Sequence, residues 1–338
     1  NYKLMLRMLG RTLQVEALCL IIPMLVALYY QEDPLPFLYT ILPVGILGTL
    51  LARLRSNAEF FSQEGFTVVG LIWLSFCLFG ALPFWFSGEF ASFADCFFES
   101  ASGFTTTGGT ILPDIESLPR SILFWRAFSS WVGGMGVLIF TMAFLPKVGG
   151  RSQMLFRAEV PGPVSTKLVP QTAHASQILY LMYFVLTGAE FIALRIAGMP
   201  WFDAITTTFA TVCTGGLSVR NLSIAAYNSP ACEIIITVFM LLCSLNFALF
   251  FLVLTGRVRQ ALGSDELKFF LLAVVLAVVI VFGNILPMYD TAGHAMRDAW
   301  FQVASIVSTT GFATTDFALW PALPQLILLL LMFLGGRA

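Results

Sequence analysis

Charged residues are scarce in this 338-residue chain, which is 11% charged and 58% hydrophobic. Soluble domains carry about a quarter charged residues, so this chain has too little polar surface for an ordinary globular protein in water. The net charge of −1, without a long basic stretch, also argues against a partner nucleic acid. The composition therefore predicts an all-α polytopic membrane protein that lies in a lipid bilayer.

Histidine and paired cysteines are scarce as well. The chain has 2 His and 6 Cys, and the cysteines lack the paired spacing of a metal site. Because most of them lie within apolar runs, we expect buried thiols. An intramembrane enzyme would need clustered His, Asp or Glu at membrane depth, and the sequence shows no such cluster. We therefore expect no enzyme, no catalytic residues and no bound cofactor.

Long apolar runs are abundant instead. A helix needs about twenty apolar residues to cross a bilayer. Eight runs qualify, near 14–31, 36–52, 66–86, 121–146, 177–198, 231–254, 268–287 and 322–338. Three further segments, near 91–104, 200–211 and 296–307, are too short to span. They are predicted to be short helices that enter the membrane and stop partway.

Each short segment leads into a polar segment with a Thr-Gly core. The three are 102–109 (Ser-Gly-Phe-Thr-Thr-Thr-Gly-Gly), 212–216 (Val-Cys-Thr-Gly-Gly) and 308–312 (Ser-Thr-Thr-Gly-Phe). Upstream of each core lies an acidic residue, Asp95, Asp203 or Asp298, which we expect to draw cations to the pore mouth. A single Thr-Thr-Gly is most often a turn. Three at matching positions predict that the segments line one pore.

Cation permeation suits these residue types. Backbone carbonyls and Thr hydroxyls replace the water shell of an ion without a fixed charge. Glycine permits the backbone conformations that this requires, and the C-terminal end of a short helix adds a partial negative charge of roughly half a unit. Irregular backbone at membrane depth is tolerated where it lines a watery cavity. The pattern therefore favours a cation pore.

The basic residues predict the orientation. If the N-terminus lies in the cytoplasm and the eight runs alternate, most of the 18 Lys and Arg residues fall on the cytoplasmic side. The expected organisation is an N-terminal helix pair (1–57), pore repeat 1 (58–148), a cytoplasmic linker (149–176), pore repeat 2 (177–262) and an incomplete pore repeat 3 (263–338). Each repeat is a helix–pore-loop–helix unit around a central pore.

Several stretches resemble the Trk/Ktr/HKT potassium-transporter superfamily, and within it most closely the TrkH-type membrane subunit. They are 101–108, 119–126, 131–136, 155–163, 201–204, 246–249 and 308–317. The resemblance implies four such repeats around one pore, so the fourth repeat is absent from this sequence. It also implies potassium uptake, a homodimer, and a TrkA-like cytoplasmic subunit that binds nucleotide and gates the pore.

The resemblance further implies which residues bind potassium. Each repeat is expected to supply one layer of ligands just before its filter glycine. The expected ligands are Thr106, Thr107, Cys213, Thr214, Thr309 and Thr310, and the filter glycines are Gly108, Gly215 and Gly311. Cys213 departs from the hydroxyl or small residue expected there. Because carbonyls do the coordinating, this change is expected to matter little.

Alternatives stay open at two levels. The chain fits a multi-pass solute carrier for an organic anion, or a symporter or channel of this superfamily that passes potassium and sodium. Glu190 fits a proton-carrying site, but a pairing with Arg195 or with backbone is the preferred interpretation. Arg126 fits a residue that tunes pore electrostatics, a snorkelling side chain or the partner of an acidic residue.

Overall fold

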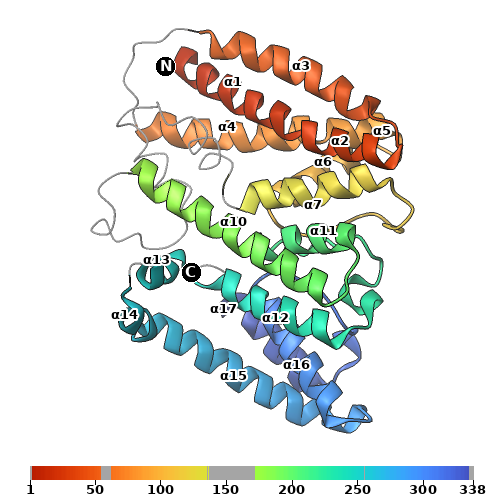
Figure 1. The fold of residues 1–338 in the computed structure, drawn as a ribbon, viewed down its shortest axis with the longest axis vertical. Helices are drawn as coiled ribbons and strands as arrows, with labels where there is room; N and C mark the ends of the chain where they lie inside the picture. Colours follow the sequence, from red (N-terminus) through yellow and green to blue (C-terminus); the bar gives the residue numbers. More distant parts are fainter. Residues whose placement is uncertain (1, 55–61, 135, 137–171, 255, 335–338) are drawn as a thin grey trace. The chain divides into compact units, whose positions relative to one another are not determined.

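A computed structural model of the chain describes residues 2–54, 62–134, 136, 172–254 and 256–334 (Figure 1). The regular structure of these ranges is helical, as the composition predicts. The chain divides into two compact units, residues 1–180 and 181–338, and the boundary falls within α10 (Thr172–Ile196). Most of the expected linker 149–176 lies outside the described residues.

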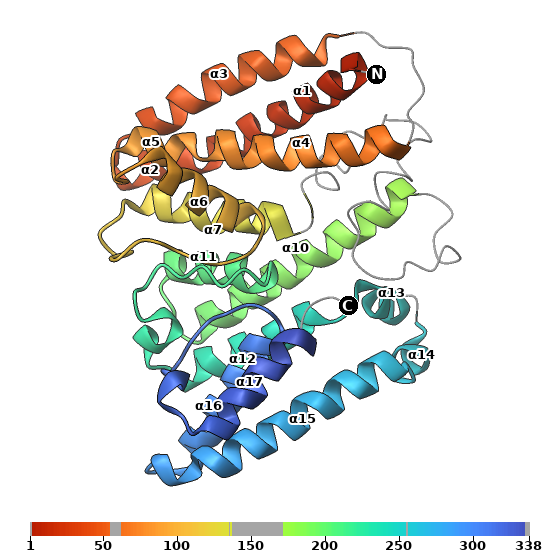
Figure 2. The ribbon, with the colours of Figure 1, turned by 180° about the vertical axis from the view of Figure 1, so that it is seen from behind.

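Long apolar helices form the frame of the first unit. They are α1 (Tyr2–Cys19), α2 (Ile21–Tyr30), α3 (Leu35–Ala52), α4 (Ser62–Gly80) and α5 (Leu82–Ser87). Helices α1, α3 and α4 lie side by side in both views (Figures 1 and 2). The contact between α1 and α3 is close at Gly10, where a Cβ would lie 2.4 Å from the backbone nitrogen of Ala52. Glycine is therefore required at that crossing.

The short helix α6 (Phe93–Phe104) packs against α4 and α7 (Arg120–Gly134). It begins at Ser92, whose hydroxyl accepts a hydrogen bond from the backbone N–H of Asp95 at 3.2 Å. It ends among aromatic rings, with the Phe104 ring centroid 5.3 Å from that of Phe76 and 5.8 Å from that of Trp125. These rings fix the position of the C-terminal end of α6.

The second unit contains α11 (Trp201–Val212), α12 (Pro230–Ser244), α13 (Phe247–Leu254), α14 (Val258–Leu262), α15 (Asp265–Ile285), α16 (Ala292–Val307) and α17 (Ala322–Leu334). Three short 3₁₀ helices, Ser223–Tyr227, Leu286–Met288 and Phe317–Leu319, lie in its connections. Two apolar cores hold the unit together. One packs α10, α11, α12 and α16, and the other packs α15, α16 and α17.

The predicted helices are largely confirmed, including the three short ones at 93–104, 201–212 and 292–307. The first helix begins at Tyr2 rather than near residue 14, because hydropathy marks the membrane core and misses the helical turns beyond it. The run 231–254 is two helices, separated at Asn246. By length and hydropathy, Tyr2–Tyr30, Leu35–Ala52, Thr67–Ser87 and Asp265–Met288 are each able to cross a membrane.

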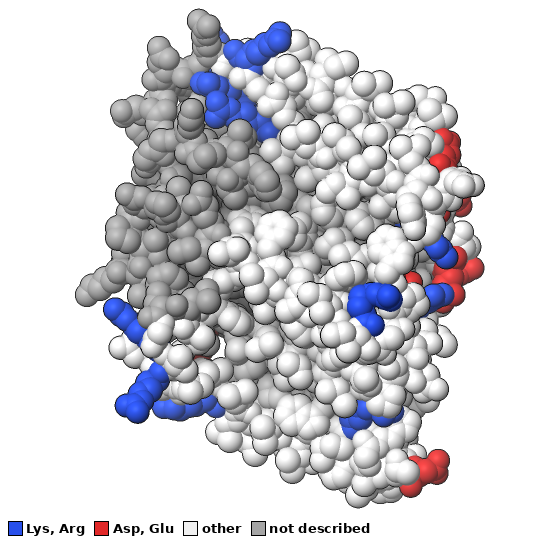
Figure 3. Space-filling view, in the orientation of Figure 1, with Lys and Arg blue, Asp and Glu red and all other residues white. Residues whose placement is uncertain are grey.

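Charged side chains gather at a few places on each unit. In the first unit, basic side chains gather near the start of α1 and the end of α3, and acidic ones near the α2–α3 connection (Figure 3). In the second unit, basic residues gather around α14, where the exposed Asp265 and Glu266 also lie, and the exposed Asp290 follows the other end of α15. Basic side chains therefore cluster at one end of each unit, as expected for helices that cross a membrane, and single arginines such as Arg120 and Arg297 lie elsewhere.

Candidate functional site

Helices α6, α11 and α16 all end in the same unusual turn. After α6, Thr106 has a φ of 55° and Gly108 a φ of 74°. After α11 and α16 the corresponding pairs are Thr214 (56°) with Gly216 (66°), and Thr309 (59°) with Gly311 (87°). We call residues 105–109 turn 1, residues 213–217 turn 2 and residues 308–312 turn 3. The three polar segments predicted from the sequence thus share one backbone geometry.

Backbone hydrogen bonds close each turn in the same pattern. In turn 1, the N–H of Thr106 donates to the carbonyl of Gly103 at 2.9 Å. The N–H groups of Thr107 and Gly108 donate to the carbonyl of Ser102 at 2.9 and 3.4 Å. The same three bonds recur in turn 2 with Thr211 and Ala210 as acceptors, and in turn 3 with Ile306 and Ser305. This is a Schellman motif, which normally places glycine at the left-handed position.

Threonine occupies that left-handed position in all three turns. A β-branched residue with positive φ is rare, because its Cβ crowds the backbone, and the cost is on the order of 1–3 kcal/mol. Thr106, Thr214 and Thr309 all accept this strain. Strain repeated at three equivalent sites points to a functional requirement for a Thr side chain there rather than to chance.

The structure shifts one predicted glycine by one residue. The sequence pattern equates Gly215 with Gly108 and Gly311, but positive φ falls at Gly216. The hydrogen bonds agree, because Gly216 and Gly108 each donate the second bond to the same type of helix carbonyl. Because residues 215 and 216 are both glycine, the sequence does not show which of them corresponds to Gly108 and Gly311. The backbone geometry shows that it is Gly216. The geometric counterpart of Gly215 is Thr107 or Thr310.

Side-chain hydroxyls brace turns 1 and 3 but not turn 2. The Ser102 hydroxyl donates to the carbonyl of Gly109 at 2.6 Å, and the Ser305 hydroxyl donates to that of Phe312 at 2.6 Å. The hydroxyls of Thr105 and Thr107 pair at 2.8 Å, and those of Ser308 and Thr310 at 2.7 Å. In turn 2 the equivalent residues are Ala210, Cys213 and Gly215, which have no hydroxyl.

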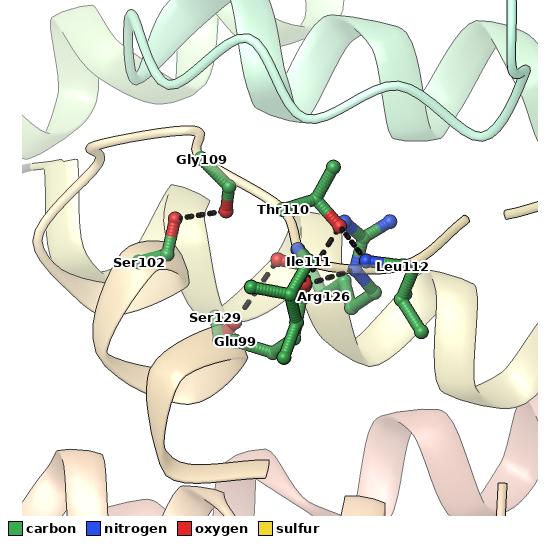
Figure 4. Close-up of polar contacts among 8 residues, drawn as sticks. All are labelled: Glu99, Ser102, Gly109, Thr110, Ile111, Leu112, Arg126 and Ser129. Carbon is green, nitrogen blue, oxygen red and sulfur yellow. Dashed lines mark hydrogen bonds and ion pairs between the residues drawn. The ribbon is translucent and has the colours of Figure 1, made fainter. Parts of the chain in front are cut away.

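An ion pair lies behind turn 1, between α6 and α7 (Figure 4). Glu99 of α6 is 1% exposed and Arg126 of α7 is 2% exposed, and their side chains meet at 2.9 Å. The other carboxylate oxygen of Glu99 accepts from the Thr110 hydroxyl at 2.6 Å and from the N–H of Ile111 at 2.9 Å. Of the three interpretations of Arg126, the one with an acidic partner is confirmed. Snorkelling is wrong, because the side chain is buried.

Turn 2 is tied to its helix by a second ion pair. Asp203, in the first turn of α11, accepts from Arg220 Nε at 3.1 Å and from its terminal nitrogen at 2.8 Å. Asp203 is 5% exposed. Burial, together with the nearby Asp203 carboxylate, raises the pKa of the Tyr227 phenol well above its usual value, so this group stays neutral. Arg220 thus anchors the segment that follows turn 2.

Hydroxyl and amide groups hold the segment that follows turn 3. Asp298 of α16 accepts from the Thr314 hydroxyl at 3.2 Å and from the Tyr289 hydroxyl at 2.8 Å. Gln302 donates to the carbonyl of Thr315 at 3.3 Å. Burial and hydrogen bonding to Asp298 raise the pKa of Tyr289 to about 12. Each short helix therefore holds the segment after its own turn.

These contacts correct the expected role of two acidic residues. Asp203 and Asp298 were expected to draw cations at a pore mouth. They are instead buried, at 5% and 3% exposure, and their carboxylates bind protein groups. Asp95 is half-buried in the first turn of α6. In the second and third copies the upstream Asp therefore holds groups of the protein around its own turn.

Turns 2 and 3 touch each other directly. A Cβ on Gly216 would lie 1.9 Å from the carbonyl oxygen of Thr310, which is far inside contact distance. The carbonyl of Ala313 accepts from the N–H groups of Ile224 and Ala225, both at 3.2 Å. The N–H of Ala313 donates to the Ser223 hydroxyl at 3.2 Å. Glycine at 216 is therefore required both by its φ and by its neighbour.

The preferred interpretation of Glu190 is wrong. Arg195 donates to the carbonyl of Met199, not to Glu190. Glu190 is fully buried, and neither of its carboxylate oxygens accepts a hydrogen bond from the described residues. The Thr211 hydroxyl beside it donates to the carbonyl of Thr207. All six cysteines are buried thiols, as expected.

The predicted ligand residues occupy all three turns. Thr106 and Thr107 lie in turn 1, Cys213 and Thr214 in turn 2, and Thr309 and Thr310 in turn 3. Thr107 and Thr309 are exposed, whereas Cys213, Thr214 and Thr310 are buried. Sequence reasoning missed Glu99. The available signal was a glutamate inside a short apolar segment, followed by an apolar run, 121–146, whose single basic residue is Arg126.

Comparison with known proteins identifies the family. A family model described as TrkH, cation transport protein, matches residues 37–338. The chain belongs to the TrkH family. It is 38% identical over 349 residues to the Trk system potassium uptake protein TrkH of Salmonella typhimurium, covering 100% of this chain and 72% of that protein. It is 34% identical to the TrkG protein of Escherichia coli, over 99% of this chain and 71% of the relative.

A solved structure of the TrkH family agrees with the fold. The crystal structure of the potassium transporter TrkH from Vibrio parahaemolyticus matches with a TM-score of 0.87 at 32% identity. The match covers 99% of this chain and 70% of that one. The all-α fold class and the family predicted from the sequence are thus confirmed. The names of these relatives describe transport proteins and not enzymes.

Proposed function

We propose that this chain forms the potassium pore of an uptake system in a prokaryotic plasma membrane. The observation that carries the proposal is the threefold recurrence of a strained Thr followed by a positive-φ glycine at the C-terminal end of a short helix. The relatives named as potassium uptake proteins support the choice of ion.

The chemistry follows from the turns. Potassium sheds its water shell against backbone carbonyls and Thr hydroxyls, which replace water oxygens without a fixed charge. In turns 1 and 3 the ligands are the residues predicted from the sequence, Thr106, Thr107, Thr309 and Thr310. In turn 2 the register shifts the predicted pair Cys213 and Thr214 by one residue, to Thr214 and Gly215. The backbone adopts positive φ at Gly108, Gly216 and Gly311, so Gly216 takes the place of the predicted filter glycine Gly215. Helices α6, α11 and α16 aim their C-terminal ends, equivalent to roughly half a negative charge each, at the turns.

The orientation and assembly belong to the same proposal. The N-terminus lies in the cytoplasm, because this orientation puts most of the Lys and Arg residues on the cytoplasmic side. Uptake then follows the membrane potential, which contributes about 2.3 kcal/mol per unit charge per 100 mV. The functional unit is a homodimer, gated by a TrkA-like cytoplasmic subunit that binds nucleotide. The repeat boundaries predicted from the sequence are kept in this proposal.

Rubidium uptake tests this function. The gene that encodes the chain is expressed at full length in cells that lack their own potassium uptake systems, and growth and ⁸⁶Rb⁺ entry are measured at micromolar to millimolar potassium. We expect growth at low potassium, and ⁸⁶Rb⁺ entry that potassium inhibits at far lower concentration than sodium. Equal inhibition by the two ions assigns a pore for both potassium and sodium. Absence of cation entry, with protein present in the membrane, contradicts the proposal.

A further inference from the structure

The buried ion pair Glu99–Arg126 has more contacts than a simple link between two helices requires. One Glu99 oxygen binds the Thr110 hydroxyl and the N–H of Ile111, at 2.6 and 2.9 Å. The other binds Arg126 Nε at 2.9 Å. These contacts join three separate pieces of chain: helix α6, the segment after turn 1, and helix α7 (Figure 4).

The ion pair helps to hold the end of turn 1, which the backbone hydrogen bonds of helix α6 do not reach. The start of the turn is set by the Schellman bonds and by the Phe104 ring among its aromatic neighbours. The end of the turn has no such backbone pattern, and two side chains of α6 hold it instead. Ser102 binds the carbonyl of Gly109, and Glu99, one helical turn earlier, binds residues 110 and 111.

Helix α7 touches the chain at the start of turn 1 and is linked to the end of the turn through Glu99. A Cβ on Gly133 would lie 1.8 Å from the carbonyl oxygen of Phe104, so α7 touches the start of the turn with its backbone. Arg126, two helical turns earlier, reaches the other end through Glu99. A small displacement of α7 is therefore transmitted to both ends of the turn.

Neither member of the pair is placed to bind the transported ion. Both Glu99 oxygens already accept hydrogen bonds, and the side chains are 1% and 2% exposed. The opposite charges cancel, so the pair adds little net field along the path. Its effect is geometric: it fixes where the carbonyls of turn 1 point.

We propose that Glu99 and Arg126 are positioning residues that set the ion preference of turn 1. This inference rests on the proposed potassium pore. Potassium and sodium differ in the spacing of ligands that replaces their water shell. A turn whose far end is loose adapts to the smaller ion, whereas a turn held at both ends keeps one spacing. The pair therefore acts on preference between ions more than on the total rate.

The test compares ion preference in matched variants of the full-length protein in liposomes. Glu99→Gln keeps the side-chain size and an acceptor for Thr110 and Ile111 but removes the charge that faces Arg126. Glu99→Gln/Arg126→Gln removes both charges. Glu233→Gln is the control, because it breaks the ion pair of Glu233 with Arg297 between α12 and α16. The readout is the ratio of sodium to potassium concentrations that halve ⁸⁶Rb⁺ uptake.

We expect the ratio to fall about tenfold in Glu99→Gln, to recover in part in the double variant, and to stay at the wild-type value in Glu233→Gln. A loss of folded protein lowers the amount of uptake but leaves the ratio unchanged, so the ratio separates positioning from mere stability. If Glu99→Gln yields too little protein, Thr110→Val is the second variant, because it removes the hydrogen bond of the Thr110 hydroxyl to Glu99. We expect it to lower the ratio about threefold.

A wild-type ratio in Glu99→Gln, or in Thr110→Val where the first variant is not recovered, overturns the inference. An equal fall in Glu233→Gln also overturns it, because the effect would then follow from any broken ion pair. Failure of the proposed function looks different, since the wild-type protein itself would show no uptake or no preference.

Discussion

Turns 1 and 2 have the same backbone and are stabilised by different means. Turn 1 carries its own polar groups, with the Ser102 bond to Gly109, the paired hydroxyls of Thr105 and Thr107, and the Glu99–Arg126 pair behind it. Turn 2 has Ala210, Cys213 and Gly215 at the equivalent positions. It is supported from outside by turn 3, which meets it at Gly216. One backbone conformation is therefore compatible with either internal or external support.

This difference makes Gly216 the most sensitive position of the three turns. A methyl group at 216 meets the carbonyl oxygen of Thr310 at 1.9 Å and also has to adopt positive φ, whereas one at Gly311 meets no atom within 4 Å. We expect ⁸⁶Rb⁺ uptake by Gly216→Ala to be at least about tenfold lower than uptake by Gly311→Ala, because the Gly311 variant has only the strain of positive φ. Uptake per folded protein is measured in liposomes.

Gly293→Ala serves as the control, since an added methyl there meets open space at ordinary φ. Equal uptake in Gly216→Ala and Gly311→Ala would contradict the contact between turns 2 and 3.

The ion pair of turn 2 is expected to have the next largest effect. Asp203→Asn leaves the half-exposed Arg220 facing a neutral amide, and the buried side chain loses its charged hydrogen bonds. We expect a loss of about 1–3 kcal/mol in unfolding free energy, seen as a lower Tm in detergent. Asp203→Asn/Arg220→Gln is expected to recover part of the loss. A double variant no more stable than Asp203→Asn would show that the pair itself contributes little.

Much of this architecture follows from the sequence. The apolar runs predict the long helices, and the three Thr-Gly cores predict the turns, because both signals are local. The register at Gly215–Gly216 does not follow, because two adjacent glycines satisfy the pattern equally and only the positive φ of Gly216 distinguishes them. The partner of Arg126 does not follow either, since Glu99 lies 27 residues away on another helix.

A reciprocal pair of variants tests internal against external support. Ser305→Ala removes the bond to the Phe312 carbonyl from turn 3 and is expected to cost about 1 kcal/mol in unfolding free energy. Ala210→Ser adds the hydroxyl that turn 2 lacks, and is expected to change stability by less than about 1 kcal/mol, since turn 2 is already held from outside. Both are read as shifts of Tm. A larger shift of Tm in Ala210→Ser than in Ser305→Ala would contradict the view that turn 2 is supported from outside.

The smallest expected effect on stability comes from the strained threonines. Thr309→Gly relieves the left-handed strain of an exposed residue, so stability is expected to rise by under about 1 kcal/mol, because glycine also gains freedom in the unfolded chain. The preference for potassium over sodium is expected to fall in the same variant. A rise in stability with unchanged preference would show that the Thr309 side chain is not needed for ion binding.

We propose above that the three turns line a potassium-selective path. The most direct measurement is the ratio of sodium to potassium concentrations that halve ⁸⁶Rb⁺ uptake, in liposomes that contain the full-length protein or its Gly108→Ser variant. Gly108 has a φ of 74°, which a serine adopts only under strain. We expect a wild-type ratio of at least about ten that falls towards one in Gly108→Ser. An unchanged ratio and an unchanged uptake rate in Gly108→Ser would contradict it.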